Sequence, residues 1–358
     1  MNTTRYQLGE LITQRREKNS ETDLPIRGVS KDGFIPPKQI DADTSIYNVF
    51  YMGDFVFNPA RMELNSIAFN DKYEKAICSS LYEVFYVHRP DIILPEYLAL
   101  IVKQNWFTRY CEFLGQGSAR EYCRFANISE IAIDVPPMDE QRKAVNSSKV
   151  ITERIELKRR INDNLANQAF AVYKDTISAH SKDGVLSDIA RITMGTSPEG
   201  DTLNDKGDGI VFYQGKTDFG FRYPTIRLYT TQPKRFAEKG DILMSVRAPV
   251  GDINIARESC AIGRGLAALK PKDGNYSFLF YTMMELYFEL SKFNDEGTVF
   301  GSITKDDLFA LQIVKLSNQK RSDFDSKVAK IDTVIQNNEE EIAQLSEMRA
   351  YILSQLAN

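Results

Sequence analysis

The chain has 358 residues, of which 42% are hydrophobic and 11% aromatic, so it can bury substantial cores and is not intrinsically disordered. A chain of this length commonly forms two domains. Its 45 Lys and Arg residues against 49 Asp and Glu residues give a net charge of -4, so nucleic-acid binding cannot be argued from overall charge and must rest on local features.

In each half of the chain, several predicted strands are followed by a predicted helix. Short runs rich in β-branched and aromatic residues, bounded by Gly, Pro and Asp, predict strands. In the first half these runs are residues 45–51, 54–58 and 80–87, and a helix is predicted over 95–114. In the second half they are residues 209–214, 240–246, 252–256 and 265–270, and a helix is predicted over 276–293. Each half is therefore expected to be a mixed, mainly antiparallel β structure with packed helices.

The two halves also resemble each other in sequence. Three segments match in the same order: residues 7–15 with 185–193, 53–68 with 240–256, and 117–133 with 297–313. Gly28 and Gly215 match as well, since they differ by the same 187 residues as Gly53 and Gly240. The offsets change only where insertions and deletions are tolerated in loops. This pattern predicts an internal repeat, with two domains built on one plan.

A long helix with a heptad pattern follows each half. Between Phe324 and Ile352, seven of nine positions at alternating spacings of four and three are apolar, with no Pro or Gly, which is typical of a coiled-coil seam. Residues 144–172 share this register at an offset of 180. The predicted seam consists of Ile151, Ile155, Lys158, Leu165 and Val172 on the first helix and Val328, Ile331, Ile335, Asn338, Ile342 and Leu345 on the second. An ordinary amphipathic surface helix is the alternative for either one alone.

Similar units that pack through one seam do so about a pseudo-two-fold axis, which makes the helices antiparallel. The fold class is therefore predicted as α+β, with two similar mixed α/β domains separated by two long antiparallel coiled-coil helices. We expect the globular domains at opposite ends of a rod about 57 Å long. The expected boundaries are 1–137 and 181–316 for the globular domains and 138–180 and 317–358 for the helices.

Motifs for catalysis are absent from the sequence. The two histidines, His88 and His180, lie in unrelated contexts, and there is no phosphate-binding GxxxxGK[ST] or GxGxxG loop. The acidic loop 199–209 lacks EF-hand spacing, and Asn58-Pro59 is not followed by the aromatic residue of an adenine methyltransferase loop. We therefore predict no catalytic, cofactor or metal site in this chain.

Polar loops punctuated by glycine are the remaining candidates for a binding surface. Arg and Lys can donate to guanine or phosphate, and Gln, Ser and Thr can bond to base edges. The candidate DNA-binding residues are Arg61, Gln116, Ser118, Arg120, Tyr122 and Arg124 in the first half and Lys216, Thr217, Arg222, Tyr223, Arg247 and Arg264 in the second.

Compartment and membrane association can also be predicted. The most apolar stretch, residues 92–107, contains Pro95, Glu96 and Lys103, so it is too interrupted to span a membrane. The first residues lack the apolar core of a secretory signal. The four cysteines show neither CxxC spacing nor the density of a disulfide framework. These features predict a cytoplasmic protein with no membrane partner.

The alternation of variable domains and long helices resembles the specificity subunit of Type I restriction-modification systems. The most specific part of the resemblance is residues 117–145, which resemble the family's glycine loop, strand and PPxxEQ helix start, here Pro136 to Gln141. Residues 195–200 and 240–251 resemble the opening and central hairpin of the family's second domain. The second helix start departs from the pattern, since it keeps Gln319 but lacks the double proline.

This resemblance implies that each globular half reads one half of a bipartite, asymmetric site on double-stranded DNA, while the helix pair fixes the spacer. Two modification subunits that bind S-adenosylmethionine and methylate adenine N6, and restriction subunits that use ATP and Mg, are the implied partners. The chain itself would do no chemistry. The alternatives are a non-catalytic protein interaction scaffold with a coiled-coil core and, from the two Gly-rich loops, an enzyme of unrecognised type.

Overall fold

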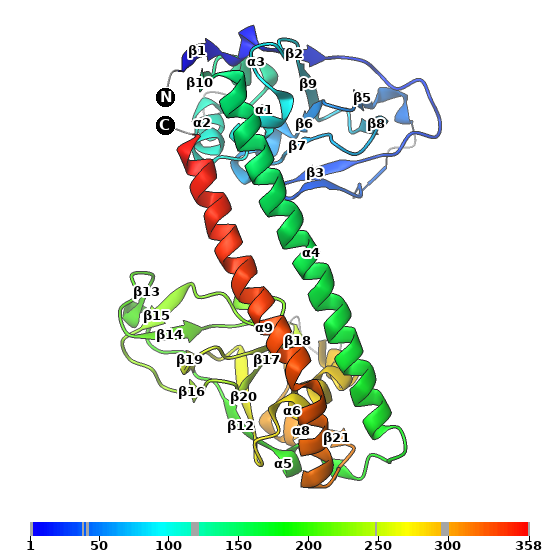
Figure 1. Cartoon of the computed structure of the whole chain (residues 1–358), viewed down its shortest axis with the longest axis vertical. Helices are drawn as coiled ribbons and strands as arrows, with labels where there is room; N and C mark the ends of the chain where they lie inside the picture. Colours follow the sequence, from blue (N-terminus) through cyan, green and yellow to red (C-terminus); the bar gives the residue numbers. More distant parts are fainter. Residues whose placement is uncertain are drawn as a thin grey trace. The chain divides into compact units, whose positions relative to one another are not determined.

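The structure is a computed structural model that describes residues 3–37, 39–40, 43–115, 122–247, 249–294 and 301–356. The chain divides into two compact units (Figure 1). Unit 1 comprises Met1–Glu156 with Ala343–Asn358, and unit 2 comprises Leu157–Ile342. Within the described ranges, no helix has the length and apolar character needed to cross a membrane.

Unit 1 is built on a four-stranded antiparallel sheet with helices packed against it. The sheet has the order β2 (Ile12–Arg15), β9 (Glu83–Val87), β6 (Phe55–Phe57) and β7 (Ile67–Phe69). Three strand pairs accompany it: β1 (Thr4–Gln7) with β10 (Ala132–Val135), β3 (Gly28–Ser30) with β4 (Gly33–Ile35), and β5 (Asn48–Tyr51) with β8 (Lys75–Cys78). The helices are α1 (Pro95–Ile101), α2 (Asn105–Gly115), α3 (Phe125–Ser129) and the start of α4 (Met138–Ile177), with 3-10 turns η1 (Leu8–Glu10), η2 (Thr44–Ile46) and η3 (Pro59–Leu64).

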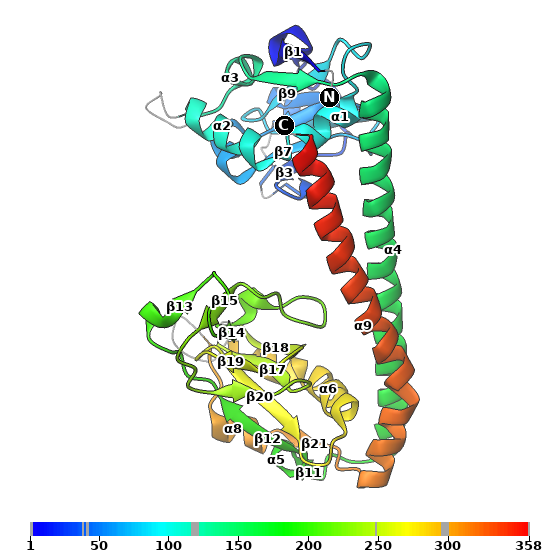
Figure 2. The ribbon, with the colours of Figure 1, turned by 60° about the vertical axis from the view of Figure 1, so that its left-hand side comes forward.

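Unit 2 repeats this plan. Its four-stranded antiparallel sheet has the order β12 (Ala190–Met194), β20 (Leu266–Pro271), β17 (Ile242–Val246) and β18 (Val250–Ile255). A second sheet joins β13 (Leu203–Asn204), β15 (Leu228–Thr230), β14 (Ile210–Tyr213), β19 (Cys260–Ile262) and β16 (Phe236–Ala237), and β11 (Gly184–Val185) pairs with β21 (Gln312–Ile313). The helices are α5 (Leu186–Ile189), α6 (Tyr276–Glu285), α7 (Tyr287–Ser291), α8 (Lys305–Ala310) and most of α9 (Asn318–Gln355), with 3-10 turns η4 (Gly200–Thr202), η5 (Lys216–Asp218) and η6 (Lys292–Asn294). In Figure 2, α6 lies between the four-stranded sheet and α9.

The predicted repeat is visible in hydrogen bonds as well as in strand order. Gly53 and Gly240 both have positive φ, +88° and +92°, which glycine adopts without strain. The carboxylate after each glycine, Asp54 or Asp241, accepts from the backbone amide three residues earlier at 2.8 Å. Because the same turn starts β6 and β17, the matched Gly-Asp pairs occupy equivalent positions in the two units.

A second equivalence supports the match of Gly28 with Gly215. Ile26 forms a parallel bridge with Ile77, and Tyr213 pairs in parallel with Ile262. Each glycine lies two residues after the bridging residue. The matched glycines therefore follow the same kind of parallel pairing in both units.

The predicted helices 95–114 and 276–293 are each interrupted. Residues 102–104 separate α1 from α2, and at this break the Lys103 amine donates to the carbonyls of Lys31 at 2.9 Å and Ile67 at 2.6 Å. Burial lowers the pKa of Lys103 to about 8. Leu286 likewise separates α6 from α7. The helical pattern of apolar residues continues through both interruptions, so the sequence predicted one helix in each place.

The two long helices pack against each other and run antiparallel. In unit 2 the ring of Tyr173 lies 5.8 Å from that of Phe324, and the Asn338 amide donates to Asn162 at 2.8 Å. Residues later in α4 therefore contact residues earlier in α9, as expected for antiparallel helices. All the predicted seam residues are buried or half-buried. This packing confirms the predicted α+β fold class.

A cluster of polar side chains interrupts the apolar seam. Lys158 donates to Asn338 at 2.9 Å and forms an ion pair with Glu341 at 2.7 Å. Asn162, which is fully buried, also donates to Glu339 at 2.9 Å. Lys158 and Asn338 are two of the predicted seam residues, and Asn162 lies at the heptad position 180 residues before a third, Ile342. Because each buried amide has its partner only in this alignment, the cluster favours one register of the two helices.

The two helices begin with different side chains in the same role. Gln141 is fully buried, accepts from the Leu94 amide at 2.9 Å and donates to the Pro136 carbonyl at 2.9 Å. In unit 2 the residue 180 positions later, Arg321, bonds to the carbonyl of Leu316, also five residues before it, and to Asp273 at 2.7 Å. The sequence departure at the second helix start is therefore compensated by Arg321, not by Gln319.

Asp325 of α9 caps the start of α6. Its carboxylate accepts from the backbone amides of Ser277 at 3.1 Å and Phe278 at 2.7 Å. Burial, assisted by the nearby carboxylates of Asp332 and Asp273, raises the pKa of Asp325 to about 6 despite these two hydrogen bonds. The cap therefore joins α6 to α9 with a carboxyl group that resists ionisation.

For the seam, we expect Asn338→Ala to lower the free energy of unfolding by about 1–3 kcal/mol, because the buried Asn162 carbonyl loses its donor. Replacing Asn162 and Asn338 together by Leu should recover most of that loss, since no orphaned amide remains. Urea unfolding followed by circular dichroism measures both variants. An Asn338→Ala protein as stable as wild type would contradict this role.

For the cap, we expect wild-type stability to fall relative to Asp325→Asn as the pH rises from about 4 to 6. The folded state binds the Asp325 proton more tightly than the unfolded chain, whose aspartate pKa is about 3.9, so the stabilisation present at low pH is lost through this window. Unfolding free energies of both proteins between pH 4 and 7 check this. Parallel pH curves would show that Asp325 does not titrate as expected.

Candidate nucleic-acid interface

Several connections of unit 2 meet at one edge of its sheets. The Thr196 amide donates to the Ile262 carbonyl at 3.0 Å, and the Val246 amide donates to the Gly265 carbonyl at 2.9 Å. The backbones approach so closely that a Cβ at Gly195 would lie 2.1 Å from the Gly263 carbonyl oxygen. Glycine is required there for space. The edge therefore gathers residues 195–197, 214–217, 247 and 263–265, which we name the glycine edge.

The glycine edge brings together four of the predicted DNA-binding residues. Lys216, Thr217, Arg247 and Arg264 are all exposed. The hydroxyl of Ser197 accepts from the Arg264 amide at 3.3 Å and from the Gln214 side chain at 3.4 Å. Sequence reasoning did not single out Ser197 or Gln214, although both flank residues that it did select.

The cations of the glycine edge differ in their partners. Lys216 forms an ion pair with Asp252 of β18 at 2.7 Å, so part of its charge is already neutralised. Arg247 and Arg264 have no carboxylate partner among the residues that the structure describes. Exposed guanidinium groups without a partner can form two hydrogen bonds to guanine or pair with a phosphate. Arg247 and Arg264 are therefore the strongest candidates in unit 2.

The structure places the side chain of Arg222, another of the predicted DNA-binding residues, inside unit 2 and not on its exposed surface. Its side chain is only 3% exposed and forms an ion pair with Asp332 of α9 at 3.3 Å. Its guanidinium also donates to the Tyr281 hydroxyl at 3.2 Å and lies 4.3 Å from the centre of the Phe280 ring. A polar loop predicted to face DNA thus turns this arginine into the core of unit 2.

Tyr223 is half-buried beneath Arg257, whose guanidinium carbon lies 4.6 Å from the centre of the ring. Burial raises the pKa of the Tyr223 phenol, so the hydroxyl stays protonated at neutral pH. The ring is covered by a cation on one side. Tyr223 can therefore help to position Arg257 as well as meet a ligand itself.

In unit 1 the candidate residues are only partly described. Gln116, Ser118 and Arg120 lie outside the described residues. Tyr122 is half-buried, and the neighbouring Arg124 lies over its ring at 5.5 Å while pairing with Glu83 at 3.3 Å.

Arg61 in unit 1 and Arg247 in unit 2 both lie in the connection that follows the equivalent strand. Arg61 is exposed in η3, the connection after β6, whereas Arg247 follows the equivalent strand β17. The Cys123 amide donates to the Pro59 carbonyl at 3.1 Å, so the segment that carries Tyr122 and Arg124 lies beside this connection. The structure therefore brings these three candidates of unit 1 together.

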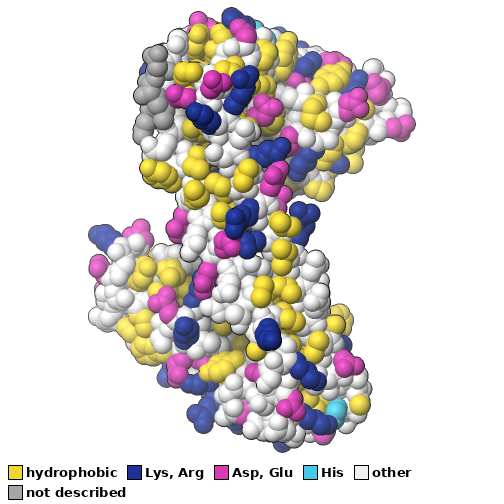
Figure 3. Space-filling model, viewed as in Figure 1, with side chains coloured by type: hydrophobic (Ala, Val, Ile, Leu, Met, Phe, Trp, Pro, Cys, Tyr) yellow, Lys and Arg dark blue, Asp and Glu magenta, His cyan; other side chains and the backbone are white. Residues whose placement is uncertain are grey.

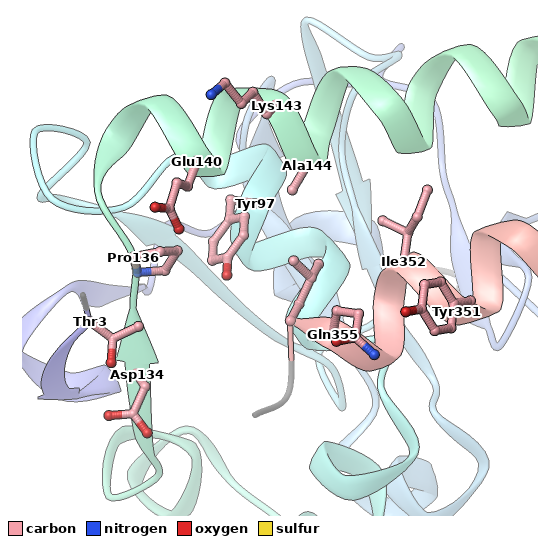
Figure 4. A pocket seen from close by; sticks show the side chains of 11 residues that line it. Thr3, Tyr97, Asp134, Pro136, Glu140, Lys143, Ala144, Tyr351, Ile352 and Gln355 are labelled. Carbon is pink, nitrogen blue, oxygen red and sulfur yellow. The ribbon is translucent and has the colours of Figure 1, made fainter. Parts of the chain in front are cut away.

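A cavity of about 440 Å³ in unit 1 lies elsewhere, between α1, the start of α4 and the end of α9 (Figure 4). Tyr97, Pro136, Ala144 and Ile352 contribute to its wall. Burial raises the pKa of Tyr97 to about 12, which keeps this phenol neutral. In the described part of the chain no group of three or more His, Cys, Asp or Glu side chains is placed to hold a metal ion.

Charges of both signs alternate over the face shown in Figure 3. On that face the described Lys and Arg side chains of each unit are interspersed with Asp and Glu. This mixing agrees with the net charge of -4. Any attraction of a polyanion to this face therefore depends on a few local cations.

The chain matches one protein family and is similar in sequence to a known protein. Residues 47–167 and 181–345 match the family of the Type I restriction modification DNA specificity domain. A relative named as the specificity subunit of the type I restriction enzyme MjaX from Methanocaldococcus jannaschii is 30% identical over 252 residues, which cover 64% of this chain. The chain spans only 59% of that relative's length.

Two solved structures align with nearly the whole of this chain. The S subunit of a Type I restriction-modification system from M. genitalium has 17% identity and a TM-score of 0.60, over 100% of this chain and 96% of that one, so it shares the fold. The HsdS subunit from Thermoanaerobacter tengcongensis has 27% identity and a TM-score of 0.40, over 99% of this chain and 96% of that one.

For the glycine edge, we expect Arg247→Ala or Arg264→Ala to weaken binding to a duplex selected from random DNA by the wild-type chain. Loss of a base contact should relax discrimination at one position by about 1–3 kcal/mol, whereas loss of a phosphate contact should weaken all sequences alike. Fluorescence anisotropy titrations at fixed salt distinguish the two. Arg191→Ala, on β12 at the end away from Gly195, is the matched control. Unchanged affinity in either edge variant would remove that arginine from the interface.

Proposed function

This chain belongs to the family of Type I restriction-modification DNA specificity subunits, and on that premise we propose that it reads a bipartite, asymmetric site on double-stranded DNA, one half with each unit. Within this proposal residues 1–137 and 181–316 are the two recognition domains. Residues 138–180 and 317–358 are the spacer helices that connect them.

The observation that carries this proposal is the duplication of one plan with different surface residues. The two units share strand order, the Gly-Asp turn and the arginine after the third strand of the sheet. Their loops, however, carry different side chains beside that arginine: Tyr122 and Arg124 in unit 1, and Arg264 in unit 2. Two domains with the same fold but different exposed side chains would contact different base sequences, as an asymmetric site requires.

The helix pair suits the role of a spacer. α4 has 40 residues and α9 has 38, so each is close to 60 Å long at about 1.5 Å per residue. Such a length exceeds one turn of DNA, which is about 34 Å. The polar cluster around Asn162 and Asn338 opposes sliding of one helix along the other.

We place the chemistry of the system on partner subunits. Two modification subunits would bind S-adenosylmethionine and methylate adenine N6, and restriction subunits would use ATP and Mg. Exposed apolar residues on the long helices, among them Leu157, Ile161 and Val334, are available for such partners. The four cysteines are buried and unpaired, which fits the reducing cytoplasm in which the complex would act.

A protein interaction scaffold is the second candidate. The acidic balance and the same exposed residues of the helices favour it. Under this reading the chain would bind its partners but would not select DNA sequences. The two candidates therefore differ in whether methylation follows a sequence motif that depends on this chain.

Sequencing of methylated adenines in the host, with and without this gene, tests the proposal. We expect a bipartite motif to lose its methylation when the gene is deleted and to regain it when the gene is restored. A gene encoding the Arg247→Ala and Arg264→Ala double variant should restore methylation less completely. An unchanged set of methylated motifs after deletion would contradict sequence recognition by this chain.

For the spacer role, we expect deletion of one heptad from both helices to shorten the preferred spacer by about three base pairs, because seven residues rise about 10.5 Å. Both half-site sequences should be kept. Methylated motifs in cells that carry the shortened gene provide the measurement. The same motif with its original spacer would contradict the proposal that the helices set the spacing.

A further inference from the structure

The connection between β14 and β15 is a closed, internally bonded loop, which we name the clamp loop (residues 214–227). Asp218 is 3% exposed and lies at its centre. The Asp218 carboxylate accepts from the Gln214 amide at 3.0 Å and from the Arg227 guanidinium at 2.7 Å. Because both ends of the loop bond to one buried carboxylate, the loop can move only as a unit.

A second contact holds the clamp loop against the four-stranded sheet. The Asn254 side chain of β18, which is 1% exposed, accepts from the Gly220 amide at 2.9 Å and donates to the Gly220 carbonyl at 3.1 Å. The Ile255 amide donates to the carbonyl of Arg222 at 2.9 Å. These hydrogen bonds hold the clamp loop at a fixed distance from β18. Its contact with α6 and α9 is made by the Arg222 side chain.

Arg222 joins the clamp loop to two helices at once. Its guanidinium bonds to Asp332 of α9 at 3.3 Å and to the Tyr281 hydroxyl of α6 at 3.2 Å. The same Asp332 carboxylate accepts from the hydroxyls of Tyr281 at 3.0 Å and Ser277 at 2.5 Å. The guanidinium, the carboxylate and two hydroxyls thus form one network shared by loop, α6 and α9.

The contact between the clamp loop and α9 is an ion pair, Arg222 with Asp332, and not an apolar contact. An ion pair whose arginine is only 3% exposed is a poor source of stability compared with well-packed apolar residues, because the guanidinium must be desolvated. What a planar guanidinium adds is direction, since its fork of donors fits its partners in one orientation. The Phe280 ring, 4.3 Å from the guanidinium carbon, further restricts its tilt. The network therefore specifies geometry.

We propose that Arg222 is a positioning residue that fixes the orientation of the clamp loop, and with it Lys216 and Thr217, relative to α9. The inference rests on the proposed function, because Lys216 and Thr217 matter only if the glycine edge meets DNA. Through Asp332, α9, which is one of the proposed spacer helices, also sets the orientation of Lys216 and Thr217 on the glycine edge of unit 2. Sequence selection by unit 2 then depends on a side chain that never touches DNA.

The test compares the full-length wild-type chain with Arg222→Lys and Tyr281→Phe. Arg222→Lys keeps the charge but loses the planar fork, and Tyr281→Phe removes only the hydroxyl shared by Arg222 and Asp332. The matched control is Tyr173→Phe, which removes a buried hydroxyl bonded to Thr282 at 3.1 Å in the same aromatic core but does not contact the clamp loop. Each protein selects from a library of random duplex DNA, and its melting temperature is measured in parallel.

We expect Arg222→Lys and Tyr281→Phe to lose discrimination by roughly tenfold at positions of one half-site, while the other half-site is read as in wild type. Tyr173→Phe should lower the melting temperature without changing the selected motif. If the first two variants also lower the melting temperature and leave the motif unchanged, Arg222 is only structural and the inference is overturned. A wild-type chain that selects no motif even in the presence of its modification subunits overturns the proposed function itself, and the inference with it.

Discussion

The antiparallel packing of α4 against α9 is the constraint on which the rest of the structure depends. An apolar seam alone would tolerate sliding by a heptad, since Ile and Leu side chains fit many holes of similar shape. The buried amides of Asn162 and Asn338 lose their partners in any shifted alignment, and an unsatisfied buried amide is costly. Register is therefore set by a few polar atoms, while the apolar residues supply the driving force for association.

In each unit, buried or half-buried polar side chains join the start of a long helix to the rest of the unit. Gln141 performs this task in unit 1, and Arg321 does so in unit 2 with a different side chain. Asp325 adds a cap on α6 in unit 2. Such bonds are directional, so the attachment fixes orientation as well as proximity. A chain with the proposed spacer role would need this rigidity, because loose attachment would vary the distance between its two proposed recognition domains.

The glycine edge combines tight backbone packing with exposed cations. Glycines at 195, 263 and 265 allow three connections to approach within distances that a Cβ would prevent. The side chains that remain, such as Arg247 and Arg264, stand on rigid backbone. Rigid placement reduces the entropy lost on binding and improves discrimination between similar ligands. The net charge of -4 weakens nonspecific attraction to DNA, so under the proposed function partner subunits would have to supply further phosphate contacts.

Elements that depend on local pattern could be predicted from the amino-acid sequence. The heptad ladder predicted two long helices in one register, the matched segments predicted two units built on one plan, and the segment from Pro136 to Gln141 indicated the family. These inferences succeeded because periodicity and turn chemistry are properties of neighbouring residues. The direction in which individual side chains point could be read only from the three-dimensional structure. Arg222 and Arg247 stand in similar polar loops, yet one is buried against Asp332 and the other is exposed, because the direction of a loop side chain depends on which distant element packs beneath it.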